Sequence, residues 1–184
     1  MKRTWVGKWA LLLAATALAG LPGTADDDNK GKGKGKGKGN AFADGREMRA
    51  ELSGYQEVPA ISTEATGEFR GTIQNNSFTY RLSYSGLEGA VVAAHIHFAQ
   101  RGVNGGVVSF LCGGGGKPAC PQSGTVNGEI TAANLFALTD QGIEAGNMAE
   151  VIRAIRAGRA YVNVHSTRFP AGEIRGQVRA GESD

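Results

Sequence analysis

The sequence predicts an all-β fold, an antiparallel β-sandwich or barrel with one or two short helices. From Arg46 onward, apolar residues alternate with polar ones at a period of two, as in strands that bury one face. The alternating stretches are short, and glycine and asparagine residues separate them. Only two segments after residue 130 have helical features, and no internal repeat is evident.

The first three predicted strands lie between residues 46 and 85. Alternation runs from Met48 to Leu52, from Ala65 to Ile73 and from Phe78 to Tyr84. Asn75-Asn76 is a good turn sequence between the second and third stretches. These two stretches are therefore expected to form a hairpin with one buried face.

Three more strands are expected at 91–98, 107–111 and 124–130. In strand 91–98, His95 and His97 share a face, because side chains two apart in a strand point the same way. The opposite face, directed to the core, is expected to hold Val92, Ala94, Ile96 and Phe98.

Two helices are expected between residues 131 and 158. The first is a short helix from Thr131 to Leu138. The second follows Asn147, which is expected to be its N-cap with Glu150 in a capping box, and Gly158 ends it. Its apolar residues follow helical spacing: Met148, Val151, Ile152 and Ile155.

The last two strands are predicted at 160–165 and about 173–179. In the first of them, Tyr161, Asn163 and His165 lie opposite the core face that holds Ala160, Val162 and Val164. In the second, Glu173 and Arg175 are expected to be exposed strand charges or a cross-strand pair. Ile174 and Val178 are expected to point inward.

Cys112 and Cys120 flank a glycine-rich loop. In an exported protein, such a close pair most simply forms a disulfide, which would reduce the entropic cost of ordering four consecutive glycines. The alternative, a thiolate metal site, is weaker because the spacing does not fit a zinc knuckle.

The N-terminal segment has the features of an export signal. Lys2, Arg3 and Lys8 precede an uncharged apolar stretch, Trp9–Leu21, and Ala25 ends a small-x-small cleavage sequence. We therefore expect a signal peptide at 1–25 and a secreted, periplasmic or cell-envelope protein. No transmembrane segment is expected in the mature chain, because the apolar stretch is short for a spanning helix.

Residues 26–45 follow as an expected disordered linker rich in lysine and glycine. The formal charge of +3 depends on these two N-terminal segments. Without their eight basic residues and Asp26–Asp28, the chain has 12 basic against 14 acidic residues. This balance argues against nucleic acid as a partner, and an extracellular or envelope protein or polysaccharide is expected instead.

All three histidines lie in two of the predicted strands. His95 and His97 place two imidazoles on one face of strand 91–98, and His165 is expected to join them from strand 160–165. Three imidazoles suit one copper or zinc ion with an open position for a further ligand. The alternative is that the rings hydrogen-bond the backbone and bind nothing.

Three other residues are candidates for the surroundings of this site. Asn163 shares the predicted face of His165. Glu57 and Glu173 could approach as carboxylate ligands or as acceptors that orient an imidazole. Ser166 is a poor nucleophile partner for His165, because adjacent strand residues point to opposite faces.

Five motifs in this order resemble the CHRD domain family: Leu52–Pro59, Ala65-Thr66-Gly67, Ala94–His97 with Gly102–Gly105, Tyr161–His165 and Pro170–Gln177. That domain is named from chordin, an extracellular antagonist of bone morphogenetic proteins, and also occurs in exported bacterial proteins. The resemblance implies a CHRD domain at 46–180 of the exported bacterial type, followed by a short tail at 181–184. It implies an immunoglobulin-like β-fold with a distant likeness to copper/zinc superoxide dismutases, and no established activity.

The function expected from these observations is a non-enzymatic, exported binding module that holds one copper or zinc ion through His95, His97 and His165. One alternative is a small mononuclear metalloenzyme, and another is a metal-free adhesion or structural domain. Dismutase activity is not expected, because copper/zinc dismutases need further histidines and an aspartate for a two-metal site, whereas this chain has three histidines.

Overall fold

The structure, a computed structural model, describes residues 45–181. The expectations for residues 1–44 and 182–184, including the signal peptide and most of the linker, lie outside the described residues. In the described part, nine strands form one antiparallel sheet in the order β5-β4-β7-β8-β1-β2-β3-β6, with β9 paired to β1. The all-β prediction is confirmed.

The strand bounds agree with the alternating patterns. The strands are β1 (Glu47–Ser53), β2 (Thr66–Ile73), β3 (Ser77–Ser85), β4 (Val91–Phe98), β5 (Gly106–Cys112), β6 (Gly124–Thr131), β7 (Ala160–Ser166), β8 (Ile174–Gln177) and β9 (Arg179–Ala180). The predicted hairpin is β2–β3, with Ile73 opposite Phe78 next to the turn. The expected single C-terminal strand is divided at Val178, whose N–H donates to Ala160 O.

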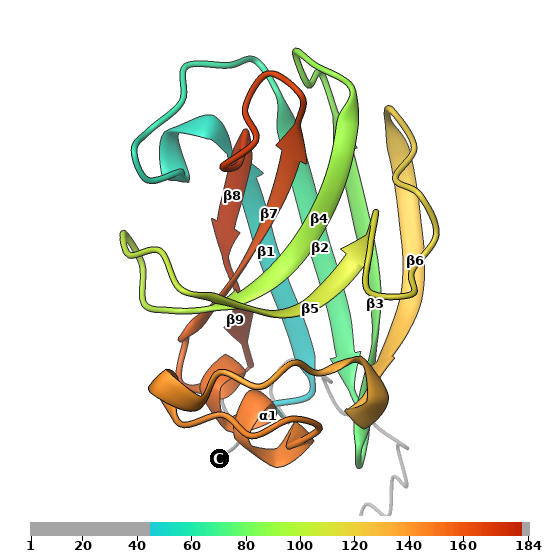
Figure 1. The fold of residues 1–184 in the computed structure, drawn as a ribbon, viewed down its shortest axis with the longest axis vertical. Coiled ribbons are helices and arrows are strands. Elements are labelled where there is room, and N and C mark those ends of the chain that lie inside the picture. The colour runs from blue at the N-terminus through green and yellow to red at the C-terminus, as the bar shows by residue number, and fades with distance from the viewer. Residues whose placement is uncertain (1–44, 182–184) are drawn as a thin grey trace, which may run out of the picture. The chain divides into compact units, whose positions relative to one another are not determined.

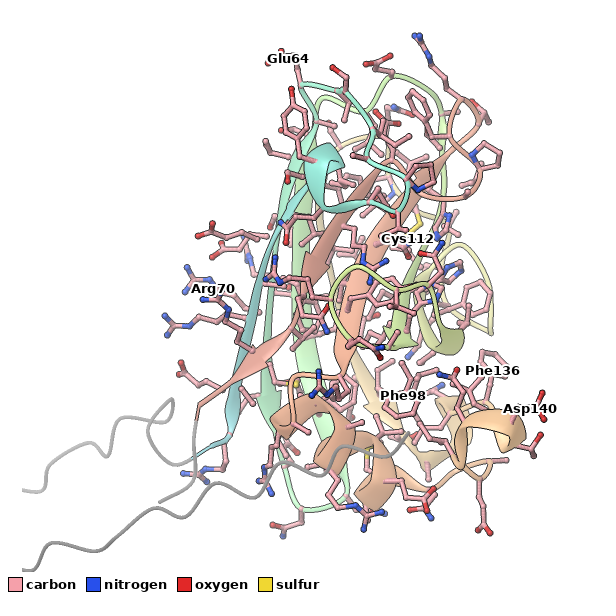
Figure 2. The ribbon with its side chains drawn as sticks, turned by 90° about the vertical axis from the view of Figure 1, so that its left-hand side faces the viewer. Glu64, Arg70, Phe98, Cys112, Phe136 and Asp140 are labelled. Carbon is pink, nitrogen blue, oxygen red and sulfur yellow. A yellow bond between two sulfur atoms is a disulfide. The ribbon has the colours of Figure 1, made fainter. Side chains whose placement is uncertain are left out.

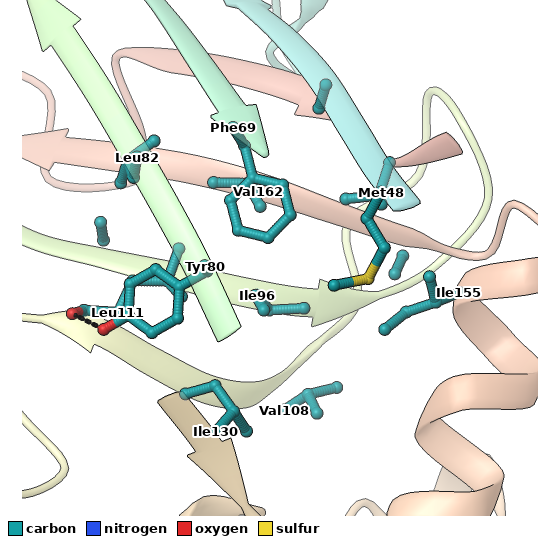
Figure 3. Packing of buried hydrophobic residues seen from close by; sticks show 14 of the residues in the cluster. Met48, Phe69, Tyr80, Leu82, Ile96, Val108, Leu111, Ile130, Ile155 and Val162 are labelled. Atoms are coloured by element: carbon teal, nitrogen blue, oxygen red, sulfur yellow. Dashed lines mark hydrogen bonds between the residues drawn. The ribbon is translucent and has the colours of Figure 1, made fainter. Parts of the chain in front are cut away.

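The sheet curls into a nearly closed barrel with an apolar interior. β5, β4, β7 and β8 form one layer, and β1, β2, β3 and β6 form the other (Figure 1). Side chains from both layers point into the same space, among them Phe69, Leu82, Ile96 and Val162 (Figure 3). All four are buried, so the hydrophobic effect acts on both layers at once.

Hydrogen bonds reach across the gap between β5 and β6, the two ends of the sheet. The Tyr80 hydroxyl on β3 donates to Leu111 O on β5 at 2.7 Å, and Lys117 Nζ donates to Glu129 O on β6. Cys112 and Cys120 are joined by a disulfide, as expected, beside the label of Cys112 in Figure 2. The loop after β5 is therefore fastened to the edge strand.

One helix, α1 (Met148–Arg156), covers one end of the barrel (Figure 1). The Asn147 side chain accepts from Glu150 N, which confirms the N-cap. The Glu150 carboxylate instead accepts from Glu144 N, so the reciprocal half of the capping box is not made. α1 buries the four apolar residues expected from its spacing.

The prediction of a helix at 131–138 was wrong. Only the 3-10 turn Ala132–Asn134 forms, and another 3-10 turn follows at Thr139–Gln141. The reason is the exposed edge of β5: Leu135 is extended, and the next residue, Phe136, donates its N–H to Val108 O. Pairing with a strand edge has replaced helical hydrogen bonding.

The first residues of β4 also depart from simple alternation. The pairing between β4 and β7 shifts register between Val91 and Ala93. As a result, Val92 is 43 % exposed rather than directed to the core, and Val91 packs against the core instead. Ala94 and Ile96 face the interior as predicted, which leaves both histidines of β4 on the outer face.

Candidate metal centre

The histidines lie on the outer face of the sheet, in two rows that cross neighbouring strands. The first row joins Phe110 on β5, His95 on β4, Asn163 on β7 and Arg175 on β8, each opposite the next. The second row includes His97, Tyr161 and Gln177. His165 lies one pair along β7, opposite Ala93. Strand pairing alone therefore brings the three imidazoles together.

Loops cover this outer face and bury it. Gly105 in the loop after β4 accepts a hydrogen bond at its oxygen from His97 Nδ1, and its N–H donates to the Tyr161 hydroxyl. Pro170 in the loop after β7 accepts at its oxygen from His165 Nδ1 at 3.0 Å. His97 and His165 are each only 8 % exposed, and His95 is partly buried.

The hydrogen bonds fix which nitrogen of each neutral ring carries the proton. Carbonyl oxygens only accept, so His97 and His165 carry their protons on Nδ1 and leave a lone pair on Nε2. His95 Nδ1 lies 2.9 Å from His165 Nε2 and donates to it, which leaves the His95 lone pair on Nε2 as well. Nε2 of His95 and of His97 is buried without a hydrogen-bond partner.

Asn163 adds one more acceptor atom to a site in which acceptors already lack donors. Its Oδ1 lies 2.9 Å from His165 Nε2, so two acceptor atoms face each other. The amide nitrogen lies on the side of Gly172 and Glu57, and Asn163 lowers the pKa of the Glu57 carboxyl. A cation between these atoms would satisfy both the ring nitrogen and the amide oxygen.

Glu57 lies at the edge of the site. Gly172, in the loop between β7 and β8, passes close to Glu57 and Asn163. A Cβ added at Gly172 would lie 2.3 Å from Glu57 Oε1 and 2.9 Å from Asn163 Nδ2, so this position of the loop needs a glycine. Glu57 Oε1 is buried and has no hydrogen-bond partner. Burial raises the pKa of Glu57 to about 7, although Arg175 opposes the shift.

Burial also keeps the histidines neutral. It lowers the pKa of His95 to about 3, with a smaller contribution from repulsion by His165 and His97. It lowers the pKa of His97 to about 4, partly offset by the hydrogen bond to Gly105. The pKa of His165 is lowered for the same main reason. Neutral imidazole is the form that binds metal ions.

The three rings could hold one metal ion. One nitrogen from each histidine can be chosen so that all three lie within 4.8 Å of one another. In a tetrahedral site with Zn–N distances of about 2.0–2.1 Å, two ligand nitrogens lie about 3.3–3.4 Å apart, so the widest pair would have to close by up to about 1.4 Å when the ion binds. The Nδ1 hydrogen bonds to Gly105 and Pro170 would orient two of the rings.

The structure places Glu173 differently from the other candidates. It is fully buried, and its carboxylate accepts from Thr63 Oγ1, Glu88 N and Ser166 Oγ. These bonds tie the loops at one end of the barrel together and do not orient a histidine. Asn163 and Glu57, in contrast, lie at the histidine cluster.

Arg175, like Glu173, was expected to be an exposed strand charge, and for both residues this prediction was wrong. Arg175 is 1 % exposed instead of a surface charge, and it forms no pair with Glu173. Its guanidinium carbon lies 3.4 Å from the centre of the Tyr161 ring, and its N–H groups donate to Asn104 Oδ1, Gln100 O and Val103 O. Arg175 therefore holds the loop after β4 over the site.

Other residues of the site were missed because they act through backbone or ring contacts. The His97 ring stacks on Tyr161 at 4.6 Å, and the His95 ring meets Phe110 edge to face at 4.3 Å. Gly114 and Gly115 pack on the other side of Phe110, so the disulfide loop supports His95 indirectly. The alternation in β7 indicated the face of Tyr161, but only the strand order shows its neighbours.

Comparison with known proteins agrees with this architecture. No curated protein and no solved structure matches the chain. None of the helices among residues 45–181 is long and apolar enough to cross a bilayer. The family model of the CHRD domain matches residues 48–178, which covers both histidine strands and all the loops over them. The chain therefore belongs to the CHRD domain family.

Proposed function

We propose that this CHRD domain is an exported, non-enzymatic binding module that holds one copper or zinc ion through His95, His97 and His165. The observation that carries the proposal is the convergence of three neutral imidazoles: one ring nitrogen from each lies within 4.8 Å of the others, and Nε2 of His95 and of His97 is buried without a partner. Buried nitrogens of this kind are costly unless a proton donor or a metal ion meets them.

Asn163 supports the same proposal. Its Oδ1 points at His165 Nε2, and an amide oxygen is an acceptable further ligand where three imidazoles bind the ion. A water molecule or a side chain of a binding partner would be the alternative ligand at this fourth position. Three nitrogen ligands with one weaker oxygen suit either copper or zinc, so the proposal keeps both metals.

The test is the metal content and affinity of the oxidised protein, beside the variant His95→Ala/His97→Ala. We expect near-stoichiometric copper or zinc in the wild type and a loss of binding in the double variant. Ile96→Val is the matched control, because Ile96 lies between the two histidines but points into the apolar core. It should keep the metal.

Thermal unfolding gives a second measurement. A ligand that binds only the folded state at 100 times its Kd adds about 2.7 kcal/mol to the free energy of unfolding. Zinc or copper should therefore raise the melting temperature of the wild type and of Ile96→Val, but not of the double variant. The absence of binding at micromolar metal would contradict the proposal and make the histidines structural.

A further inference from the structure

A cavity of about 220 Å³ opens beside the histidine cluster, between the loop after β1 and the loop after β4. Its lining includes Tyr55, Glu57, Arg101, Arg175 and Gln177. A larger groove of about 470 Å³ adjoins it, sharing Arg101 and Gln177 and adding Arg179. The two spaces share Gln56, Arg101 and Gln177 and lie along the outer side of β1, β8 and β9.

Glu57 and Gln177, which line the small cavity, each have a buried side-chain oxygen that lacks a donor. Glu57 Oε1 and Gln177 Oε1 have no hydrogen-bond partner. The orientation of Gln177 is fixed, because its Nε2 donates to Ala99 O and Gly158 O. Unsatisfied buried acceptors are costly, so they indicate a ligand that brings O–H or N–H groups.

The same cavity has an excess of positive charge. Arg175 donates only to neutral oxygens, and Arg101 forms one long bond of 3.4 Å to Gln56 Oε1. Within residues 45–181, no carboxylate lies at ion-pair distance from either guanidinium. Glu57 is the one acidic residue in the lining, so an additional anionic group would be attracted.

Tyr55 adds an aromatic surface to the lining of this cavity. It is 74 % exposed, the most exposed of the large apolar or aromatic side chains in the described part of the chain, and it lines the same cavity. An exposed aromatic ring gives a flat, rigid apolar surface that costs little conformational entropy on binding. The C–H face of a sugar ring is a suitable partner for it.

We propose that this cavity binds a uronic acid residue of an acidic polysaccharide. The sugar carboxylate would bind Arg101, the ring would stack on Tyr55, and the sugar hydroxyls would face the cavity wall that Glu57 and Gln177 form. The adjoining groove, with Arg179, would receive the carboxylate of a neighbouring sugar. Inorganic phosphate or sulfate has no ring face to stack on Tyr55, which is 74 % exposed. The site needs no metal ion.

The test uses the full chain and oligogalacturonate, with the methyl-esterified oligosaccharide as a neutral match that has the same hydroxyl groups. Isothermal titration in chelator at physiological salt measures the Kd for the wild type and for Arg101→Gln, Tyr55→Ala and the control Arg81→Gln. Arg81 is an exposed arginine on β3 that does not line the cavity. Circular dichroism checks that each variant is folded.

We expect the acidic oligosaccharide to bind and its methyl ester to bind at least tenfold more weakly. Arg101→Gln and Tyr55→Ala should each weaken binding about tenfold or more, and Arg81→Gln should leave it unchanged. Equal affinity in Arg101→Gln and wild type would show that the ligand binds elsewhere on the chain and would overturn the proposal. Preference for oligoglutamate, or binding that needs a metal ion, would also overturn it.

Discussion

Replacing Glu57 with glutamine removes a carboxyl group that is 7 % exposed and adjoins the candidate metal centre. Burial raises its pKa from 4.5 to about 7 in the folded protein. An acid whose pKa is raised on folding stabilises the fold fully below its unfolded pKa, and this contribution is lost as the pH rises through the folded pKa. Glutamine does not titrate, so Glu57→Gln should not show the loss.

The size of the effect follows from the shift. One pKa unit corresponds to about 1.4 kcal/mol, so the difference between 4.5 and about 7 gives about 3 kcal/mol at most. Without metal, the free energy of unfolding of the wild type should fall relative to Glu57→Gln between pH 5 and pH 9 by about this amount. The histidines are the same in both proteins, so their own titration cancels from the difference.

Urea denaturation in the presence of a chelator, at several pH values, measures this difference. Glu51→Gln is the control, because Glu51 is an exposed glutamate on β1. Added zinc should reduce the pH dependence, since a nearby cation favours the charged carboxylate. If the gap between wild type and Glu57→Gln is constant from pH 5 to pH 9, burial does not control the titration of Glu57, and the reasoning is refuted.

Three further predictions concern stability, and denaturation curves test all of them. Arg175→Met should destabilise the protein by about 3 kcal/mol or more, because Asn104 Oδ1, Gln100 O and Val103 O lose a charged donor that holds the loop after β4; a cost under about 1 kcal/mol would contradict this. Phe69→Ala should cost about 3–5 kcal/mol and the half-exposed Phe136→Ala much less; equal costs would show that the barrel interior is not the main core. Cys112→Ser/Cys120→Ser should cost about 2.5 kcal/mol by loop-closure entropy over a separation of 8 residues, and an unchanged unfolding midpoint would count against that model.

Much of the fold could be predicted because one face of most strands is apolar. The alternation in β1, β2 and β3 gives their bounds to within a few residues, and the cap at Asn147 marks the start of α1. The helix expected at 131–138 failed for a tertiary reason. No local pattern shows that the edge of β5 would take the N–H of Phe136.

The candidate site was predictable only in part. His95 and His97 share a face by strand geometry, and the polar positions of β7 indicated His165 and Asn163. The burial of Arg175 was not predictable, because an arginine between apolar strand residues is usually a surface charge. Its role depends on strand order, which places β8 beside β7 and under the loop after β4.

β7 is buried on both faces, and this has a consequence for how the strand finds its place. Ala160, Val162 and Val164 fit only the apolar interior, while Tyr161 and His165 fit only the polar outer layer. A shift of one residue against β4 would exchange the two sets, burying an imidazole and an amide among hydrocarbons and leaving valines among hydrogen-bonding groups. Both the apolar inner face and the polar outer face of β7 therefore specify its register against β4. Misaligned forms of this central strand should be strongly disfavoured during folding.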